Sequence, residues 1–261
     1  MYHDCMSSCI VQIASVRTKI ISLCVVSVLA IASCASQGSA VAVNYDMAKV
    51  YLADKGPAPG QSGNFWDGLE GVKVAKYPWG GGSEDASGIF YLAADGNNLY
   101  MRAEIQDCAP QVRSTDMDPS LSWNGTSLQF FFGTDTKKRS EYSDSDSGLS
   151  FWVVQNEAGN DFSPENLKVM VSKGRLLNER QCKAVVVDWT DSSYIIEASM
   201  PLDVLGIYKP FKAGQKVMAE FRINHAKIGE DRSVIVNWRT STDDAWKDPN
   251  TWSFGIVEKK S

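Results

Sequence analysis

The stretch IFYLAADGNNLYMRAEI, residues 89–105, decides the fold class. Its first part, Ile89–Ala94, is an apolar run of strand length, and Asp95–Asn98 then supplies residues that favour a tight turn. Leu99–Ile105 follows with partial alternation of apolar and polar side chains. Two strand-like segments on either side of a turn predict a β-hairpin.

Strand patterns continue from this hairpin to the C-terminus, with turn residues between them. A short helical turn is expected at Met200–Gly206, because Pro201 suits the first turn of a helix and Gly206 suits the position after its end. Many short strands predict an all-β fold, an antiparallel β-sandwich of the immunoglobulin or jelly-roll kind. The other expected strands are Ser127–Phe132, Leu149–Gln155, Cys182–Trp189, Tyr194–Met200, Val217–Asn224, Val234–Trp238 and Ser253–Val257.

Composition and charge narrow the class of protein. The chain has 261 residues, of which 44% are hydrophobic and 22% charged, as in ordinary globular proteins. Its net charge is −5, so the basic surface that nucleic acid requires is missing, and nucleic acid is not expected as a partner. Residues 46–261 are long enough for one large β-sandwich domain.

The N-terminal segment has the pattern of a secretory signal. Arg17 and Lys19 precede the apolar run Ile20–Ile31, and small residues follow it. The run is too short to span a bilayer comfortably. Residues 1–15 fit no signal pattern, so we expect that translation starts near Val16 rather than at Met1.

The four residues Ile31–Cys34 resemble a bacterial lipobox. The resemblance implies a signal peptide of residues 1–33, lipid attachment at Cys34 and a polar tether of residues 34–45. Because Ala35 rather than Asp follows the cysteine, it further implies a lipid-anchored protein of the cell envelope, at the outer membrane. An ordinary signal peptide with an incidental cysteine is the alternative.

Two cysteines, Cys108 and Cys182, follow the predicted cleavage point. In an oxidising compartment they could form a disulfide, although two separate buried thiols fit the sequence as well. The sequence contains no CxxC pair and no His-rich spacing, so its spacing does not indicate a zinc site.

Two of the eight tryptophans, Trp123 and Trp246, stand in polar loops. A large aromatic side chain in such a loop is either a lid on the core or an exposed platform. An indole ring can cover the apolar face of a pyranose, at about 1–3 kcal/mol by analogy with base stacking. Each neutral hydrogen bond adds about 0.5–1.5 kcal/mol. Two platforms and a few polar contacts predict a Kd of roughly micromolar to millimolar.

Four segments match, in order, the motifs of one protein family. They are a strand beginning NLY (98–107), a segment beginning with Trp (123–131), a strand with Tyr, Glu and a final Pro (194–201), and a C-terminal segment containing WKDP and FG (238–255). From about residue 65 to residue 258 the chain resembles the family 9 carbohydrate-binding modules and their relatives with a DOMON-like sandwich.

The resemblance implies a sugar-binding site and its residues. Family members hold the terminal sugar between two tryptophans, whose positions fall on Trp123 and Trp246. A family Asn falls near Asp243, which Asp244 follows, and a family carboxylate falls on Gln129. An amide there weakens or redirects binding, because charge-assisted hydrogen bonds are about twice as strong as neutral ones.

Two further features each have two interpretations. A family arginine falls near Trp152, which is either a third apolar wall of the sugar site or a core residue. Asp144 and Asp146 alternate as in a partial calcium loop, and the family implies structural calcium, whereas a solvated acidic loop is the second interpretation. No other cofactor is expected.

The predicted function is non-catalytic binding of an oligo- or polysaccharide at the cell envelope, in support of polysaccharide capture or breakdown beside glycoside hydrolases. A weakly catalytic or hydrolase-associated domain is one alternative. Asp243, Asp244 and Asp248 lie near Trp246, but no carboxylate that could face them across a scissile bond is evident.

Two more functions are compatible with the same fold. Some DOMON-like sandwiches transfer electrons through haem b, and Met101, Met170, Met218 and His225 are the candidate ligands here. A structural envelope module with a cleft that binds no sugar is equally compatible with a β-sandwich.

Overall fold

The computed structural model describes residues 43, 44, 46–114, 116–154, 166–172, 175–227 and 230–260. These residues belong to one compact unit, Ser39–Ser261. The predicted signal peptide, Cys34 and most of the tether lie outside the described residues. Within the described ranges, no helix has the length and hydropathy that a membrane span requires.

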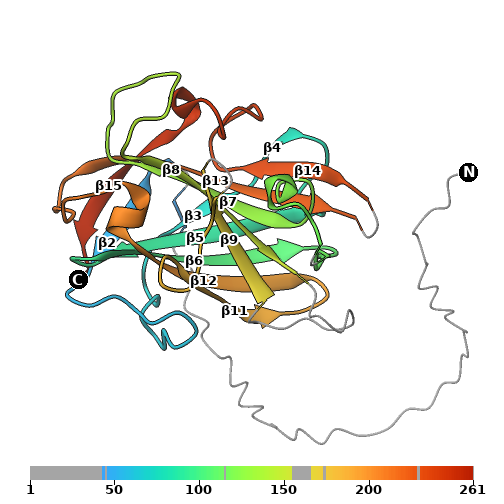
Figure 1. The fold of residues 1–261 in the computed structure, drawn as a ribbon, viewed down its shortest axis with the longest axis horizontal. Coiled ribbons are helices and arrows are strands. Elements are labelled where there is room, and N and C mark those ends of the chain that lie inside the picture. The colour runs from blue at the N-terminus through green and yellow to red at the C-terminus, as the bar shows by residue number, and fades with distance from the viewer. Residues whose placement is uncertain are drawn as a thin grey trace, which may run out of the picture. The chain divides into compact units, whose positions relative to one another are not determined.

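The described strands join into one curled sheet (Figure 1). Its main path runs in the order β10-β9-β8-β7-β13-β15-β2-β5-β6-β12-β11. Beside this path, β14 pairs with β13 and β4, and β3 pairs with β1 and β5. The strands are β1 (Val43–Asn44), β2 (Ala48–Leu52), β3 (Gly71–Val74), β4 (Lys76–Trp79), β5 (Ala86–Ala94), β6 (Asn98–Asp107), β7 (Ser127–Gly133), β8 (Asp146–Val153), β9 (Leu167–Val171), β10 (Arg175–Leu176), β11 (Lys183–Trp189), β12 (Ser193–Pro201), β13 (Lys216–Ala226), β14 (Arg232–Asn237) and β15 (Ser253–Lys259).

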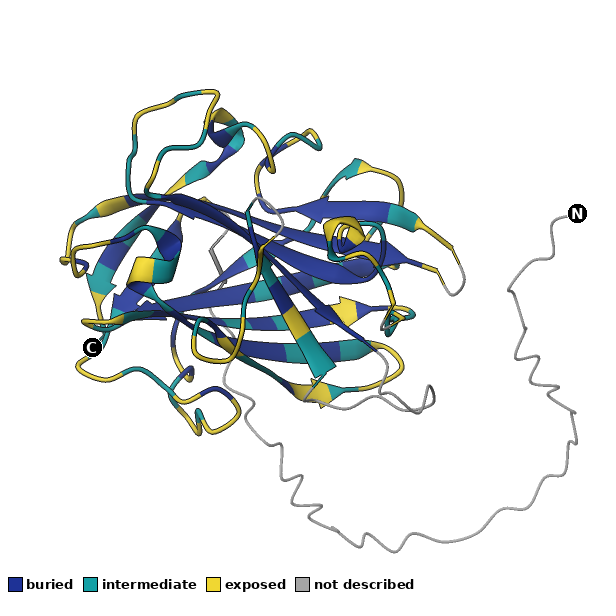
Figure 2. Ribbon diagram, viewed as in Figure 1, coloured by how far each residue is buried: buried dark blue, intermediate teal, exposed yellow. Residues whose placement is uncertain are grey.

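The two halves of the sheet pack face to face as a β-sandwich, which confirms the predicted fold class. Phe90 of β5 lies 4.9 Å from Phe221 of β13 between ring centroids, and Phe221 stacks on Phe130 of β7 at 5.3 Å. Apolar side chains from both halves form one continuous core. Figure 2 shows this core as buried strands, while the exposed residues lie mostly in loops and at strand ends.

The sheet is mixed rather than purely antiparallel. β2 runs parallel to both β15 and β5, and thereby joins the two halves of the sandwich. Its sequence, Ala48–Leu52, is short and lacks a clear alternation, so the sequence pattern did not reveal it. The short strands β3, β4, β9 and β10 were missed for the same reason.

The predicted hairpin and helical turn are both present. β5 and β6 pair from Ala86–Asp107 to Ala94–Leu99, and the Asp95 carboxylate accepts N–H bonds from the turn. The helical turn is a 3-10 helix, η3 (Leu202–Leu205), which ends at Gly206 with a left-handed φ of 73°. Gly206 therefore acts as the sequence indicated, whereas Pro201 ends β12 and caps the helix rather than lying in its first turn.

Cys108 and Cys182 are free thiols, so the disulfide that the sequence left open is not formed. Cys182 is buried in the core beside β11, near the start of β6, whereas Cys108 follows the end of β6. Residues at opposite ends of a ten-residue strand are separated by roughly 26 Å or more at about 3.3 Å per residue. A disulfide spans Cα atoms about 4.4–6.8 Å apart, so the two cannot meet.

Candidate functional site

One row of side chains crosses five strands on the outer face of the sandwich. Met170 of β9 pairs with Ser150 of β8, and Ser150 pairs with Gln129 of β7. The row continues through Arg222 of β13 to Asn237 of β14. Because successive side chains of a strand point to opposite faces, this row faces away from the core that Phe130 and Phe221 fill.

Four members of this row form the floor of a cleft. The cleft has a volume of about 460 Å³, within the range of about 300–1,000 Å³ for small-ligand sites. Its lining comes from several of the strands already described and from the loops beside them. The lining residues are Ser120, Trp123, Gln129, Phe131, Tyr142, Gly148, Ser150, Met170, Val171, Ser172, Arg222, Arg232, Asp243 and Trp246.

Arg222 is the buried cation of the cleft floor. Its Nε donates to Asn237 Oδ1 at 2.9 Å, and its Nη1 donates to Asp243 Oδ1 at 2.5 Å and to Gln129 Oε1 at 3.4 Å. Burial lowers the pKa of the guanidinium, and the charge of Asp243 opposes this effect. Its Nη2 is buried and has no hydrogen-bond partner within the described part of the chain. The floor therefore holds one uncommitted charged donor.

Asp243 joins the floor to a second arginine. While its Oδ1 accepts from Arg222, its Oδ2 accepts from Arg232 Nη2 at 2.9 Å. Arg232 also donates through Nη1 to Asn224 Oδ1 at 3.3 Å. The carboxylate is therefore held between two guanidinium groups.

Arg232 lies between two indole rings. Its Cζ is 4.8 Å from the ring centroid of Trp123 and 5.3 Å from that of Trp79. Both distances are within cation–π range. Trp79 ends β4 and is half-exposed, so the aromatic surface extends beyond the cleft.

The loop that carries Trp246 is fixed from beneath. The buried Glu220 carboxylate accepts backbone N–H bonds from Trp238, Arg239 and Thr240 at 2.8–3.1 Å. Further along the loop, Trp252 Nε1 donates to the carbonyl of the buried Ala245 at 2.8 Å. These bonds hold both ends of the segment that presents Asp243 and Trp246.

The loop that carries Trp123 is fixed from the side. It begins with a 3-10 turn, η1 (Pro119–Leu121), whose cap Asp118 accepts from Ser120 N–H. Asn124 Nδ2 then donates to Asp231 Oδ1 at 2.7 Å, just before β14. Trp123 is therefore attached to the strand that carries Arg232.

The structure brings four of the six predicted sugar-site residues into the cleft. Trp123 is 39% exposed, Trp246 is 57% exposed, and both line the cleft together with Gln129 and Asp243. Asp244 lies outside the lining and pairs with Lys247 at 2.9 Å.

Trp152 does not line this cleft. It is buried on β8, and its indole Nε1 has no partner among the described residues. Of its two interpretations, the structure favours the buried position over a wall of the site.

The sequence did not single out Arg222, Arg232 or Trp79. Arg222 lies in a strand whose alternate residues are apolar, and a charge at such a position marks an outer face with a polar role. Trp79 stands before three glycines, a loop position of the kind that singled out Trp123 and Trp246. The sequence therefore held a signal for Arg222 and one for Trp79. No sequence pattern near Arg232 identifies the residues that it contacts.

The residues predicted as calcium or haem ligands lie in several different environments. Asp146 accepts from Arg139 Nη2 at 2.6 Å and from Ser143 N–H at 2.8 Å, and Asp144 is exposed. The arginine supplies the positive charge that calcium would bring, so these contacts do not favour an ion there, and calcium stays a prediction. Of the haem candidates, Met101 lies in the core, Met170 on the cleft floor and Met218 against Trp252.

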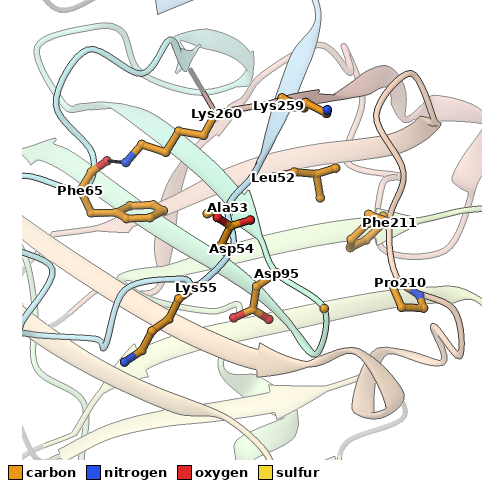
Figure 3. A pocket seen from close by; sticks show the side chains of 11 residues that line it. Leu52, Ala53, Asp54, Lys55, Phe65, Asp95, Pro210, Phe211, Lys259 and Lys260 are labelled. Atoms are coloured by element: carbon orange, nitrogen blue, oxygen red, sulfur yellow. Dashed lines mark hydrogen bonds between the residues drawn. The ribbon is translucent and has the colours of Figure 1, made fainter.

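A larger hollow lies elsewhere on the surface (Figure 3). It has a volume of about 650 Å³, and lysine and aspartate side chains line much of it. Two of its charged groups are already bonded: Asp95 accepts from Gly56, Asn97, Asn98 and Tyr100, and Lys260 donates to the Phe65 carbonyl. The aromatic-walled cleft is therefore the better candidate site.

A β-sandwich with an aromatic-walled cleft on its outer face has the architecture of a ligand-binding module. The model of the family described as carbohydrate family 9 binding domain-like matches residues 59–259. The chain belongs to this family of binding modules.

Solved structures support the fold. A family 9 carbohydrate-binding module from Caldicellulosiruptor kristjanssonii, in complex with cellotriose, has a TM-score of 0.61 and 19% sequence identity to this chain. The match covers 82% of this chain and 95% of that module. The same module in complex with glucose gives the same TM-score and identity, with 97% of it covered.

Two longer proteins contain a related region. Endo-1,4-beta-xylanase A of Thermotoga maritima is 22% identical over 194 residues, and that of Thermotoga neapolitana is 21% identical over the same length. The match covers 73% of this chain and 16% of each xylanase. The chain therefore spans less than a fifth of the length of these relatives.

Glu220→Gln tests whether the buried carboxylate at the base of the Trp246 loop makes the stability of the protein depend on pH. Burial raises the pKa of Glu220 to about 7, although four backbone N–H donors oppose the shift. Since the folded state then holds this proton more tightly, the wild-type free energy of unfolding falls as the pH rises from about 4.5 to about 7. The variant should lack the contribution of Glu220 to this change of unfolding free energy with pH, which is at most about 1.4 kcal/mol per pH unit.

Urea unfolding at about pH 5 and about pH 8 measures the effect. The exposed Glu179 provides the matched control, and Glu179→Gln should leave the slope unchanged. If wild type and Glu220→Gln differ by the same free energy at both pH values, Glu220 does not titrate in this interval.

Proposed function

We propose that this chain binds an oligo- or polysaccharide between Trp123 and Trp246 and does not cleave it. The carrying observation is that one cleft combines two partly exposed indoles with a buried guanidinium that has a free donor. Indoles suit the apolar face of a pyranose, and Arg222 suits its hydroxyl rim. The related module solved with cellotriose and with glucose adds support.

The floor offers donors and acceptors of several kinds. Gln129 Nε2 reaches Ser150 Oγ at only 3.3 Å, and its Oε1 is 3.4 Å from Arg222, so both bonds are long and exchangeable. A sugar hydroxyl can replace either of them. Arg222 Nη2 is buried beneath this floor, so a hydroxyl must displace the side chains above it to reach it. Such a bond would be the strongest available, because hydrogen bonds to charged groups contribute about 1.5–3 kcal/mol.

The pairing of Asp243 with two arginines is unsuited to a glycosidase mechanism. Hydrolysis needs two carboxyl groups about 5–9.5 Å apart across the scissile bond, one of which donates a proton. Among the described residues that line the cleft, Asp243 is the carboxylate, and it is paired with two arginines. It is placed to organise the floor.

The proposed location is the outer membrane, and the proposed partners are glycoside hydrolases. We infer that Cys34 is lipidated, that the chain is held at the outer membrane and that it acts beside glycoside hydrolases. The lipobox-like Ile31–Cys34 supports the anchor, and the two xylanases with a related region support the partnership.

Cys34→Ser tests the anchor. The variant should shift from the membrane fraction to the soluble fraction of the cell envelope, because the acylated thiol is lost. Immunoblots of fractionated cells measure the shift, and Cys182→Ser, which alters a buried thiol, should leave the protein with the membrane. Equal membrane retention of all three proteins would refute lipid anchoring at Cys34.

Trp123→Ala and Trp246→Ala test the sugar site. Each should weaken binding about 5- to 150-fold, since losing one platform costs about 1–3 kcal/mol. Affinity electrophoresis over a panel of polysaccharides finds the ligand, and calorimetry with cellotriose then gives the Kd. The control is Tyr208→Ala, which removes an aromatic side chain that is 81% exposed and lies outside the cleft. Equal affinities for all variants, each with the wild-type melting temperature, would contradict the proposal.

Trp79→Ala tests whether the site extends along a chain. Trp79 contacts the same guanidinium as Trp123 but does not line the cleft, so we expect it to contact a second sugar unit rather than the first. The variant should bind cellotriose several-fold more weakly and glucose unchanged. An equal loss for both ligands would instead show that Trp79 only holds Arg232 in place.

A further inference from the structure

A cluster of three side chains lies outside the cleft and has no part in the proposed sugar binding. Asp85 precedes β5, Cys108 follows β6 and His225 lies near the end of β13. One ligand atom from each lies within 4.8 Å of the other two. Among the described residues, this is the one set of three such side chains that converges in this way.

The orientation of His225 is set by a buried carboxylate. Asp107 Oδ1 lies 2.8 Å from His225 Nδ1, and both side chains are fully buried. With Asp107 as acceptor, Nδ1 carries the proton, and Nε2 presents its lone pair towards Cys108. A carboxylate that orients an imidazole from behind is the usual second layer of a metal-bound histidine.

The distances already fit a metal ion. His225 Nε2 lies 3.9 Å from Cys108 Sγ. In a tetrahedral zinc site, bonds of about 2.3 Å to sulfur and about 2.0 Å to nitrogen place the two ligand atoms about 3.5 Å apart. A shift of a few tenths of an ångström therefore brings this pair to zinc-binding distance, while the Asp85 carboxylate, within 4.8 Å of the other two, must move further towards them on binding.

The backbone holds the third ligand beside the other two. Cys108 N–H donates to the Asp85 carbonyl at 2.8 Å, so the two residues cannot move apart independently. Asp85 Oδ2 accepts from Gly82 N–H at 2.9 Å, which leaves the other carboxylate oxygen available.

The local charge also favours a cation. Asp85 and Asp107 bring two carboxylates to a region where Lys227 is the cation acting on Cys108. Asp107 Oδ2 is buried without a hydrogen-bond partner within the described part of the chain. A bound divalent cation would compensate this buried negative charge.

We propose that Asp85, Cys108 and His225 bind a divalent cation of the zinc class, with Asp107 as the positioning residue behind His225. Sulfur, nitrogen and oxygen ligands together suit Zn²⁺, whereas Ca²⁺ and Mg²⁺ prefer oxygen alone. On binding, the Cys108 thiol releases its proton to solvent. Because Cys108 is exposed, water completes the coordination. The ion links β13 to the β5–β6 hairpin of the opposite half.

Cobalt(II) is the probe that tests this site. The reduced, metal-free full-length protein is titrated with Co²⁺, which gives a sulfur-to-cobalt charge-transfer band in the near ultraviolet when a thiolate binds it. The band should saturate at one equivalent in the wild type, be absent in Cys108→Ser and require more cobalt in Asp85→Asn. It should be retained in Cys182→Ser, which removes a thiol far from the cluster, and in Trp246→Ala, which alters the cleft.

Zinc competition and thermal melting supply the quantitative test. Zn²⁺ should displace the cobalt and raise the wild-type melting temperature, and Asp107→Asn should weaken zinc binding about 10- to 100-fold. Identical cobalt titrations for wild type, Cys108→Ser and Asp85→Asn would overturn the proposal. So would a zinc-induced shift in melting temperature that Cys108→Ser leaves unchanged.

Discussion

The cleft depends on one buried cation, Arg222. A guanidinium removed from water costs several kcal/mol unless it is paired, so the surrounding chain must supply acceptors. Asn237 does so from the neighbouring strand, and Asp243 does so from the loop that carries Trp246. The requirement to neutralise Arg222 therefore fixes where that loop sits. It also brings Arg232, through the shared carboxylate, to the side of Trp123.

β13 connects this site to the rest of the sandwich. Its inward residues, such as Phe221, fill the core, while three of its outward residues, Glu220, Arg222 and Asn224, are polar yet buried. On the outer face, Glu220 holds the base of the Trp246 loop and Arg222 forms the cleft floor. His225, on the same face as Phe221 and near the end of the strand, belongs to the proposed metal cluster. A zinc ion there would fix the register of β13 against the β5–β6 hairpin, and so stabilise the platform on which the cleft is built.

Local patterns predicted most of the fold and singled out two tryptophans that line the cleft. The β5–β6 hairpin is defined by its turn residues, and Trp123 and Trp246 stand out because polar loops rarely carry indoles. The parallel pairing of β2 was not predictable, because it depends on strands remote in sequence. The same holds for the cluster at Asp85, Cys108 and His225, whose ligands are too far apart in the chain to form a recognisable spacing.

The floor, rather than the walls, should decide which sugar is bound. An indole covers the apolar face that most pyranoses share, so two tryptophans provide affinity with little discrimination. Discrimination comes from polar groups that are left unpaired when the wrong hydroxyl pattern binds. Gln129 occupies the position where the family resemblance implied a carboxylate. A carboxylate there would pair with Arg222, whereas the neutral amide leaves that cation with Asp243 as its one charged partner in the cleft lining. If the proposed site binds a sugar, the amide at Gln129 should therefore give it a different hydroxyl preference from a family site with a carboxylate there.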